Sequence, residues 1–218
     1  MSVEREKRLA AEAAAALVEP GMTVGLGTGS TVAWLLRALA RRALPIRCVA
    51  SSPHTESLAR ELGLRVEPFD RAGGIPRLDL AIDGADEIAP DGWLRKGGGA
   101  AHTREKIVAA ASDRFVVIAD SRKLRPSLAG PVPVELLAFG LAATLRRLAP
   151  IALRDAPPSP DGGLIADYRG PIGDPARLAA ALSATPGLVE HGLFPPSLVS
   201  EALVGRGDSV ERHPFSRP

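Results

Sequence analysis

The sequence contains little cysteine and few aromatic residues. Among its 218 residues are one cysteine, two tryptophans, one tyrosine and five phenylalanines. A single cysteine excludes a disulfide framework within the chain and a cysteine-based zinc site. Cys48 lies in the apolar run "IRCVA" and is expected to be a small buried residue. Since hydrophobic residues still make up 45% of the chain, we expect a large core of aliphatic side chains and alanine.

The sequence also lacks a dominant charge and a long apolar run. Its 27 Lys and Arg residues nearly balance 25 Asp and Glu residues, so we expect no nucleic-acid partner. The first residues are charged and no apolar run reaches about 18 residues, so neither a signal peptide nor a membrane span is expected. The protein is therefore predicted to be cytoplasmic. The four histidines show no metal-ligand spacing, so no metal site is expected.

Periodicity over the first 130 residues predicts an α/β fold. Short β-branched or apolar runs alternate with amphipathic, alanine-rich stretches, as strands alternate with helices in a doubly wound, mostly parallel, Rossmann-like sheet. We expect strands at 22–26, 46–51, 78–83 and 114–120, and helices at 4–18, 30–42, 53–63 and 100–112.

The pattern changes after Pro131. We expect further strands at 132–136, 164–168, 187–194 and 197–205, and helices at 139–148 and 175–184. This predicts a small α+β lobe at about 131–194, inserted into an α/β catalytic domain formed by residues 1–130 and about 195–206. Residues 207–218 show no periodicity and are expected to be a disordered tail.

A glycine-rich turn, "GLGTGST" at 25–31, stands between the first predicted strand and its helix. It lacks the last glycine of a dinucleotide loop and the Gly-Lys-Ser/Thr end of a nucleotide-triphosphate loop. Backbone N–H groups at a helix N-terminus, with the hydroxyls of Thr28, Ser30 and Thr31, suit one compact phosphate monoester. The alternative is that Ser30 or Thr31 only caps the helix.

An acidic segment, "DGADE" at 83–87, directly follows the predicted strand at 78–83. In a parallel sheet the carboxyl ends of the strands line the ligand crevice. Carboxylates crowded at such an edge repel one another, which suits proton transfer. The alternative is an acidic turn that faces solvent.

A third motif, "KGGGAAHTREK" at 96–106, joins a lysine and three glycines to a predicted helix. The glycines let the backbone approach a ligand closely, and Lys96 adds a cation. Glu105 falls on a stripe of small apolar residues and is a candidate general base. The alternative is a surface glutamate, which is favoured near a helix N-terminus. The pattern does not decide whether His102 is exposed.

Lysine is rare among the basic residues. Only Lys7, Lys96, Lys106 and Lys123 are lysines, and arginine is used elsewhere. A lysine kept where arginine is the usual choice indicates a need for a compact ammonium group.

In their order and spacing these motifs resemble ribose-5-phosphate isomerase of the A type. "SS" at 51–52 and "IADSRK" at 118–123 extend the resemblance, which spans about residues 3–206. It implies an enzyme without a cofactor, a homodimer or homotetramer, that interconverts D-ribose 5-phosphate and D-ribulose 5-phosphate in the non-oxidative pentose phosphate pathway. It also implies that the substrate contacts Lys7, Thr28, Gly29, Ser30, Thr31, Asp83, Gly84, Ala85, Asp86, Lys96, Gly97, Gly98, Gly99 and Lys123.

The resemblance implies that Glu105 is the catalytic base. Such a base would move a proton between C2 and C1 of the sugar through an enediolate. We expect Lys96 and the glycine N–H groups to stabilise the enediolate oxygen, Asp83 to open the sugar ring, and Asp86 to orient hydroxyl groups.

Two other functions are considered. One is a sugar-phosphate sensor domain, which would need an N-terminal DNA-binding segment where only about 20 residues precede the first predicted strand. The other is a different sugar-phosphate enzyme of similar fold, in which "DGADE" with "KGGGAAHTREK" is not expected. The sequence departs from the family pattern at His102, at Gly163, where asparagine is common, and in the shortened stretch 124–133.

Overall fold

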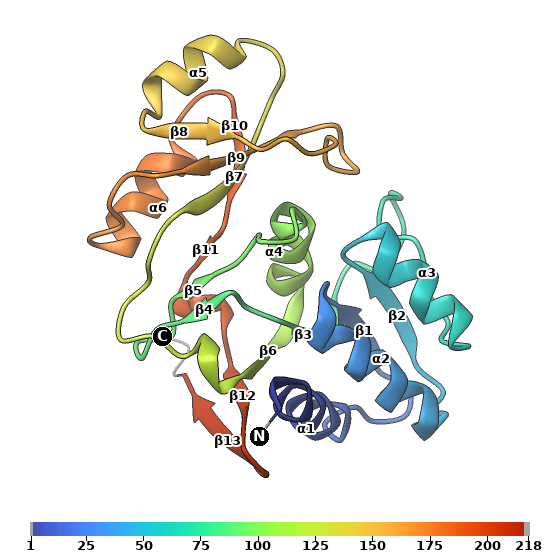
Figure 1. Cartoon of the computed structure of the whole chain (residues 1–218). Helices are drawn as coiled ribbons and strands as arrows, with labels where there is room; N and C mark the ends of the chain where they lie inside the picture. Colours follow the sequence, from blue (N-terminus) through green and yellow to red (C-terminus); the bar gives the residue numbers. More distant parts are fainter. Residues whose placement is uncertain (1, 216–218) are drawn as a thin grey trace. The chain divides into compact units, whose positions relative to one another are not determined.

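The structure is a computed structural model that describes residues 2–215 and divides the chain into two compact units (Figure 1). Unit 1 comprises Met1–Ala85, Arg104–Lys123 and Pro196–Pro218, and unit 2 comprises Asp86–Thr103 and Leu124–Pro195. The division places residues 86–103 with the second unit, whereas the predicted boundary left them in the first domain. A compact unit need not be a domain that folds alone, so the predicted domain boundaries stay a prediction.

Unit 1 is built on a six-stranded sheet with the order β13-β12-β6-β3-β1-β2. All neighbouring strands are parallel except β13, which pairs antiparallel with β12. The strands are β1 (Thr23–Leu26), β2 (Arg47–Ala50), β3 (Leu78–Asp83), β6 (Ser112–Asp120), β12 (Glu201–Arg206) and β13 (Ser209–Pro214). The helices are α1 (Val3–Ala15), α2 (Ser30–Arg42), α3 (Pro53–Glu61), α4 (His102–Ala110, which begins in unit 2), η1 (Ser121–Lys123) and η2 (Pro196–Leu198).

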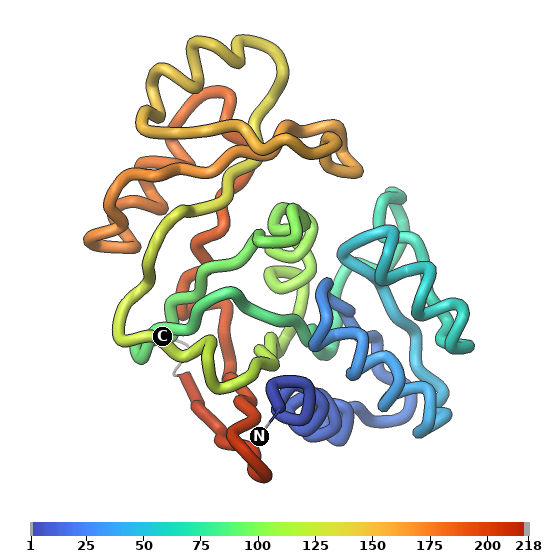
Figure 2. The backbone as a smooth tube through the Cα atoms, viewed as in Figure 1, coloured from blue at the N-terminus to red at the C-terminus, as the bar shows by residue number. Residues whose placement is uncertain are grey.

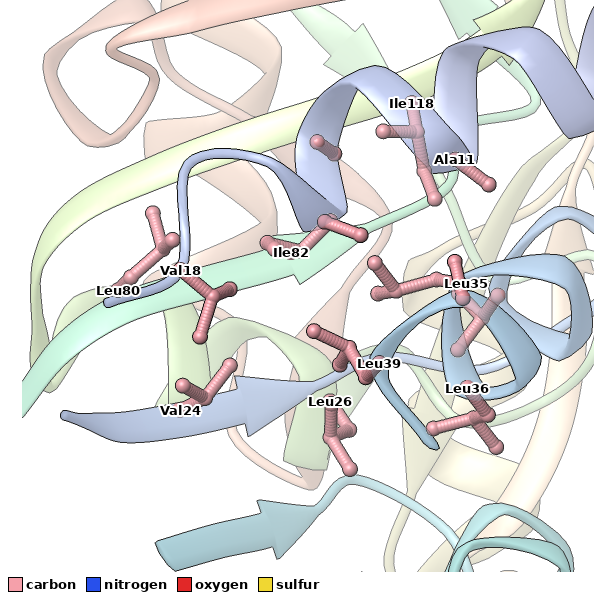
Figure 3. Close-up of a cluster of buried hydrophobic side chains, with 14 of the residues drawn as sticks. Ala11, Val18, Val24, Leu26, Leu35, Leu36, Leu39, Leu80, Ile82 and Ile118 are labelled. Carbon is pink, nitrogen blue, oxygen red and sulfur yellow. The ribbon is translucent and has the colours of Figure 1, made fainter. Parts of the chain in front are cut away.

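One face of this sheet is covered by α1, α2 and α3. Alternate residues of a strand point to the same face, so Val24 and Leu26 of β1 meet Leu35 and Leu39 of α2 in the buried core (Figure 3). Alanines of α1, such as Ala11, let that helix lie close to the strands. The core is aliphatic, as its composition predicts.

The other face of the sheet is covered by α4. Val108 of α4 packs so closely over Gly25 of β1 that a Cβ at Gly25 would collide with it. Helices on both faces of a parallel sheet confirm the predicted doubly wound fold.

The predicted disordered tail is wrong for residues 209–214. These residues form β13, which turns back at Gly207 and pairs with β12 over its whole length, as the red end of the tube in Figure 2 shows. The sequence of β13 gives no alternation because this edge strand contributes little to the core. Residues 216–218 of the predicted tail lie outside the described residues.

Unit 2 contains a four-stranded sheet with the order β10-β7-β9-β8 and a small sheet with the order β11-β5-β4. Two helices complete a core around β7, which confirms the predicted α+β lobe. The strands are β4 (Glu87–Ile88), β5 (Leu94–Arg95), β7 (Val132–Leu136), β8 (Ile151–Leu153), β9 (Leu164–Tyr168), β10 (Leu188–His191) and β11 (Leu193–Phe194), and the helices are α5 (Leu141–Arg147) and α6 (Pro175–Ser183).

Within residues 2–215, no helix combines the length and the apolar composition that crossing a membrane requires.

Candidate active site

Three neighbouring strands of unit 1 end in polar residues at the same edge of the sheet. Ser51 follows β2, Thr28 follows β1, and Asp83 ends β3. The hydroxyl oxygens of Thr28 and Ser51 are 2.9 Å apart, and the N–H of Thr28 donates to Oδ1 of Asp83 at 2.9 Å. Ligands of doubly wound folds bind at this carboxyl edge. The glycine turn and the start of the acidic segment are therefore brought together.

Asp83 is 3% exposed, so the alternative of a solvent-facing acidic turn is wrong here. Its Oδ1 also accepts the N–H of Gly84 at 2.6 Å. The carboxylate lies directly against Gly27, where any Cβ would overlap it. Gly27 is thus required by a close approach, and the two N–H donors fix the orientation of the carboxylate.

The glycine turn leads into α2 without a side-chain cap from its N-cap residue. That residue is Gly29, with a φ of 121°, and Ser30 and Thr31 lie inside the first turn. The alternative that Ser30 or Thr31 is the cap is therefore wrong. Nζ of Lys7 donates to Oγ of Ser30 at 3.0 Å and to Oε1 of Glu4 at 2.7 Å. An ammonium group beside a helix N-terminus favours an anion there.

Glu6, the neighbour of Lys7 in α1, ties this helix to two other segments of unit 1. Its carboxylate accepts the N–H of Gly207 at 2.9 Å, and the N–H and hydroxyl of Ser121 at 3.0 and 2.8 Å. These bonds, led by the one from Gly207, hold the pKa of Glu6 below its ordinary value of 4.5, against the effect of burial. Ser121 opens η1, which carries Lys123, so Glu6 links the two elements that hold Lys7 and Lys123.

Glu105 lies in the first turn of α4 and is 6% exposed, so the alternative of a surface glutamate is wrong. It shares the buried face of α4 with Val108 and Ala109, three and four residues further along. Because Val108 packs over Gly25, this face is turned toward the sheet. The helix of a β–α–β crossover runs antiparallel to its strands, so Glu105 lies nearer the carboxyl edge of the sheet than Val108 does.

In unit 2, Asp86 holds the glycine loop at 97–99. Its Oδ2 accepts the N–H of Gly98 at 2.8 Å and lies 3.6 Å from Nη1 of Arg95. A Cβ at Gly98 would come within 2.8 Å of the carboxylate, so the glycine permits this contact. Asp86 therefore has a structural partner that the sequence did not reveal.

Lys96 follows β5 and is only 3% exposed. Its N–H donates to the carbonyl of Gly192 at 2.8 Å, and its Nζ lies 5.5 Å from the centre of the Phe194 ring, a cation–π distance. A buried ammonium group is costly unless its surroundings compensate it, so such lysines are often functional.

His102 is completely buried, which answers the question that the sequence left open. Its Nε2 lies 3.4 Å from the carbonyl oxygen of Glu190. The imidazole packs against Gly97, where a Cβ would come within 2.8 Å of Nδ1. Gly97 has a φ of 99°, a conformation that favours glycine. His102 thus shapes the glycine loop from the start of α4.

A buried acid in β7 binds the next residue of α4. Glu135 accepts hydrogen bonds from the hydroxyls of Thr103 and Ser159. Its carboxylate occupies the space above Gly163, where any Cβ would overlap it. This contact accounts for glycine at position 163.

Hydrogen bonds within unit 1 join Lys7 to Ser30, and Asp83 to both Thr28 and Gly84. Ala85 and Lys123 belong to the same unit, and Lys106 follows Glu105 on α4. Asp86, Lys96 and the loop 97–99 belong to unit 2. Sequence reasoning missed the polar partners Ser51, Glu6, Arg95 and Glu135. Only Ser51 had a signal, the "SS" after a strand.

Comparison with known families gives two matches. The model of the family described as ribose 5-phosphate isomerase A (phosphoriboisomerase A) matches residues 47–209. The model of the DeoR C terminal sensor domain matches residues 2–66, a smaller part of the chain.

Individual relatives match over nearly the whole chain. The chain is 50% identical to ribose-5-phosphate isomerase A of Caulobacter vibrioides, covering 97% of this chain and 99% of that one. It is 46% identical to the protein of that name from Natronomonas pharaonis, covering 95% and 96%.

Solved structures match the fold over a similar span. Ribose 5-phosphate isomerase A from Neisseria gonorrhoeae superposes with a TM-score of 0.93 at 30% identity, covering 99% of this chain and 98% of that one. A D-ribose-5-phosphate isomerase in complex with phospho-erythronic acid gives a TM-score of 0.91 at 33% identity, covering 98% and 100%.

Proposed function

The chain belongs to the ribose 5-phosphate isomerase A family, so we infer that it is an aldose–ketose isomerase that interconverts D-ribose 5-phosphate and D-ribulose 5-phosphate. The family assignment rests on matches that span the chain, and the buried polar groups described above suit the chemistry. The roles of individual residues are our proposal. They are supported by burial, hydrogen bonds and charge within each unit.

The observation that carries the proposed mechanism is the burial of Glu105 on the sheet-facing side of α4. In the open-chain aldose, the carboxylate of Glu105 removes the proton from C2, and the electron pair of that bond forms the C1–C2 double bond of an enediolate. The proton is then delivered to C1, while the O2 proton is lost and O1 is protonated, which gives the ketose. One base on one face of the sugar serves both steps.

Charge that develops on the enediolate oxygens requires a nearby cation or N–H donors. We assign this role to the ammonium of Lys96 and to N–H groups of Gly97, Gly98 and Gly99. A buried ammonium stabilises such charge more strongly than a solvated one. Asp83, whose orientation two N–H donors fix, is assigned to proton transfer during ring opening. Asp86 is assigned to the sugar hydroxyls.

The phosphate is assigned to the N-terminus of α2. Lys7 donates to Ser30 at this point, and Thr28 to Thr31 supply N–H groups and hydroxyls. Lys123 is assigned to the substrate as well, with Gly84 and Ala85. Binding energy from the phosphate holds the reacting carbons in place, so it contributes to turnover as well as to affinity.

The sensor alternative is not favoured, because the sensor-domain model covers only residues 2–66 while isomerase relatives cover nearly the whole chain. We propose that the enzyme acts in the cytoplasm, in the non-oxidative pentose phosphate pathway, as a homodimer or homotetramer without a metal or other cofactor.

A direct assay tests the assignment. The protein is incubated with ribose 5-phosphate, and ribulose 5-phosphate is measured, with allose 6-phosphate as a competing ligand. We expect turnover that saturates with substrate. Binding of ribose 5-phosphate without any ribulose 5-phosphate would favour the sensor function instead.

A further inference from the structure

Arg154 links the β8–β9 hairpin of unit 2 to the glycine loop at 97–99. It directly follows β8, and its N–H donates to the carbonyl of Ile165 at 2.9 Å, which extends the pairing of β8 with β9 by one residue. Ala152 lies opposite Asp167 in this pairing. Residues two apart on a strand share a face, so Asp167 is the diagonal cross-strand neighbour of Arg154.

Asp167 fixes the guanidinium of Arg154 in one orientation. Nε of Arg154 donates to Oδ2 of Asp167 at 3.0 Å, and Nη2 donates to Oδ1 at 2.7 Å. This is the bidentate geometry in which an arginine and a carboxylate bind most specifically. The side chains are 20% and 19% exposed, so water competes only partly for the pair.

The third nitrogen of the guanidinium binds the glycine loop. Nη1 of Arg154 donates to the carbonyl of Gly97 at 2.9 Å and to that of Gly98 at 3.2 Å. One anchored cation therefore holds two successive carbonyl groups of the loop.

The direction of these carbonyls sets the direction of the N–H groups that follow them. In a trans peptide the C=O of one residue and the N–H of the next point to opposite sides. The N–H of Gly98 accordingly points away from Arg154 and donates to Asp86 on the other side. By the same geometry, the N–H of Gly99 points away from Arg154, because the carbonyl of Gly98 is held toward it.

Without such an anchor the loop has many alternatives. Three successive glycines have wide conformational freedom, and Gly97 and Ala100 both occupy positive φ, at 99° and 60°. Asp86 holds the loop at a single N–H. Arg154 adds two contacts on the opposite side and leaves few orientations for the Gly98–Gly99 peptide.

We propose that Arg154, anchored by Asp167, is a positioning residue that orients the Gly98–Gly99 peptide so that its N–H is presented to the anionic substrate. This rests on the proposed isomerase function, because the loop is assigned there to the enediolate. Arg154 itself acts only through the loop and through Asp167.

The test compares Arg154→Ala and Arg154→Lys with Arg177→Ala, which removes an exposed arginine of α6 in the same unit. Lysine keeps the charge but lacks the planar fork that binds a carboxylate and two carbonyls together. We expect kcat to fall about tenfold in both Arg154 variants with KM changed less than twofold, since the N–H acts on charge of the transition state. Guanidinium ion at non-denaturing concentration restores part of kcat in Arg154→Ala only.

A second measurement does not depend on the substrate. Amide hydrogen exchange of the peptide that covers residues 96–101 is expected to be faster in both Arg154 variants than in the wild type and in Arg177→Ala. If hydrogen exchange of this peptide is unchanged in the Arg154 variants, the positioning role is overturned. It is also overturned if exchange becomes faster while kcat stays unchanged. A wild-type protein that forms no ribulose 5-phosphate overturns the proposed function, and the exchange result then shows separately whether the clamp on the loop exists.

Discussion

Asp83, Lys96 and Glu105 are each at most 6% exposed, although all three carry ionisable groups. Such side chains are rarely buried unless they are paired or have a function. Two glycines nearby are required because a Cβ at either position would collide with a carboxylate. Gly27 admits the carboxylate of Asp83, and Gly98 admits that of Asp86. At the scale of residues, the motifs are therefore sets of close contacts around charged groups.

Replacing Glu105 tests its role as the base. We expect Glu105→Gln to lower kcat by a factor of about 10² or more, because the amide is nearly the same size but cannot accept the C2 proton. Affinity for a non-reacting substrate analogue, measured by calorimetry, should remain within a few-fold of the wild type.

The matched control is Glu61→Gln, which makes the same change on an exposed residue of α3. It should leave kcat unchanged. Near-normal turnover of Glu105→Gln would remove Glu105 as the base.

The sequence revealed these candidate residues better than their partners. Asp83, Lys96 and Glu105 stand in recognisable motifs, so they were found without a structure. Arg154 and Glu135 were not, because Arg154 binds the loop 97–99 and Glu135 binds Thr103 and Ser159, which are all at least 24 residues away in the chain. The burial of His102 likewise depends on Gly97 and Glu190, which no local pattern reports.

At the scale of elements, long periodic segments were predicted closely and short ones were missed. The helix predicted at 30–42 and the strand at 78–83 have the bounds of α2 and β3. The short strands β4, β5 and β8 were missed, because two or three residues give no period. The hairpin partner β13 was missed because it depends on backbone pairing with β12 and on the contact of Gly207 with Glu6.

The contact of α1 with η1 and with the β12–β13 turn can be tested by Glu6→Gln. The glutamine has one acceptor oxygen and presents an NH₂ group to backbone N–H donors. We expect a loss of about 1–3 kcal/mol in the free energy of unfolding at pH 7, measured by urea denaturation. Glu56→Gln, which weakens an exposed i,i+4 pair with Arg60, should cost no more than about 0.5 kcal/mol.

The Glu6→Gln variant also tests how the contribution of Glu6 to the free energy of unfolding depends on pH. The pKa of Glu6 in the folded protein is below 4.5, so the unfolded chain takes up the proton first as pH falls. The contribution of Glu6 is thus fully present above pH 4.5 and is lost as pH falls through the folded pKa. The difference in the free energy of unfolding between wild type and Glu6→Gln should therefore shrink below pH 4.5. A difference that is independent of pH would contradict the role of the ionised carboxylate.

At the scale of the whole molecule, both units contribute residues that the sequence motifs single out. The chain passes from unit 1 to unit 2 after Ala85, inside the acidic motif, and returns at Arg104, inside α4. The sequence predicted the two folds, and its domain boundaries stay a prediction, because residues 86–103 carry no long element that would indicate to which domain they belong.

Assembly is predicted from the family. Light scattering of the purified protein should give a mass of two or four times the chain mass of 22.7 kDa. A stable monomer that retains full activity would contradict this prediction.

Chelation tests the expectation that no metal takes part. Dialysis against EDTA should leave kcat unchanged, because the proposed mechanism assigns to the ammonium of Lys96 the positive charge that a metal would otherwise provide. A loss of activity that a divalent cation restores would show that a metal site had been missed.

The most direct test of the isomerase mechanism follows ribose 5-phosphate by NMR in D₂O in the presence of the enzyme. Proton transfer through an enediolate exposes the transferred proton to exchange with solvent on the base. We predict that ribulose 5-phosphate forms catalytically and carries deuterium at C1, and that Glu105→Gln slows its formation by about 10²-fold. Absence of ribulose 5-phosphate with the wild-type protein would contradict the account.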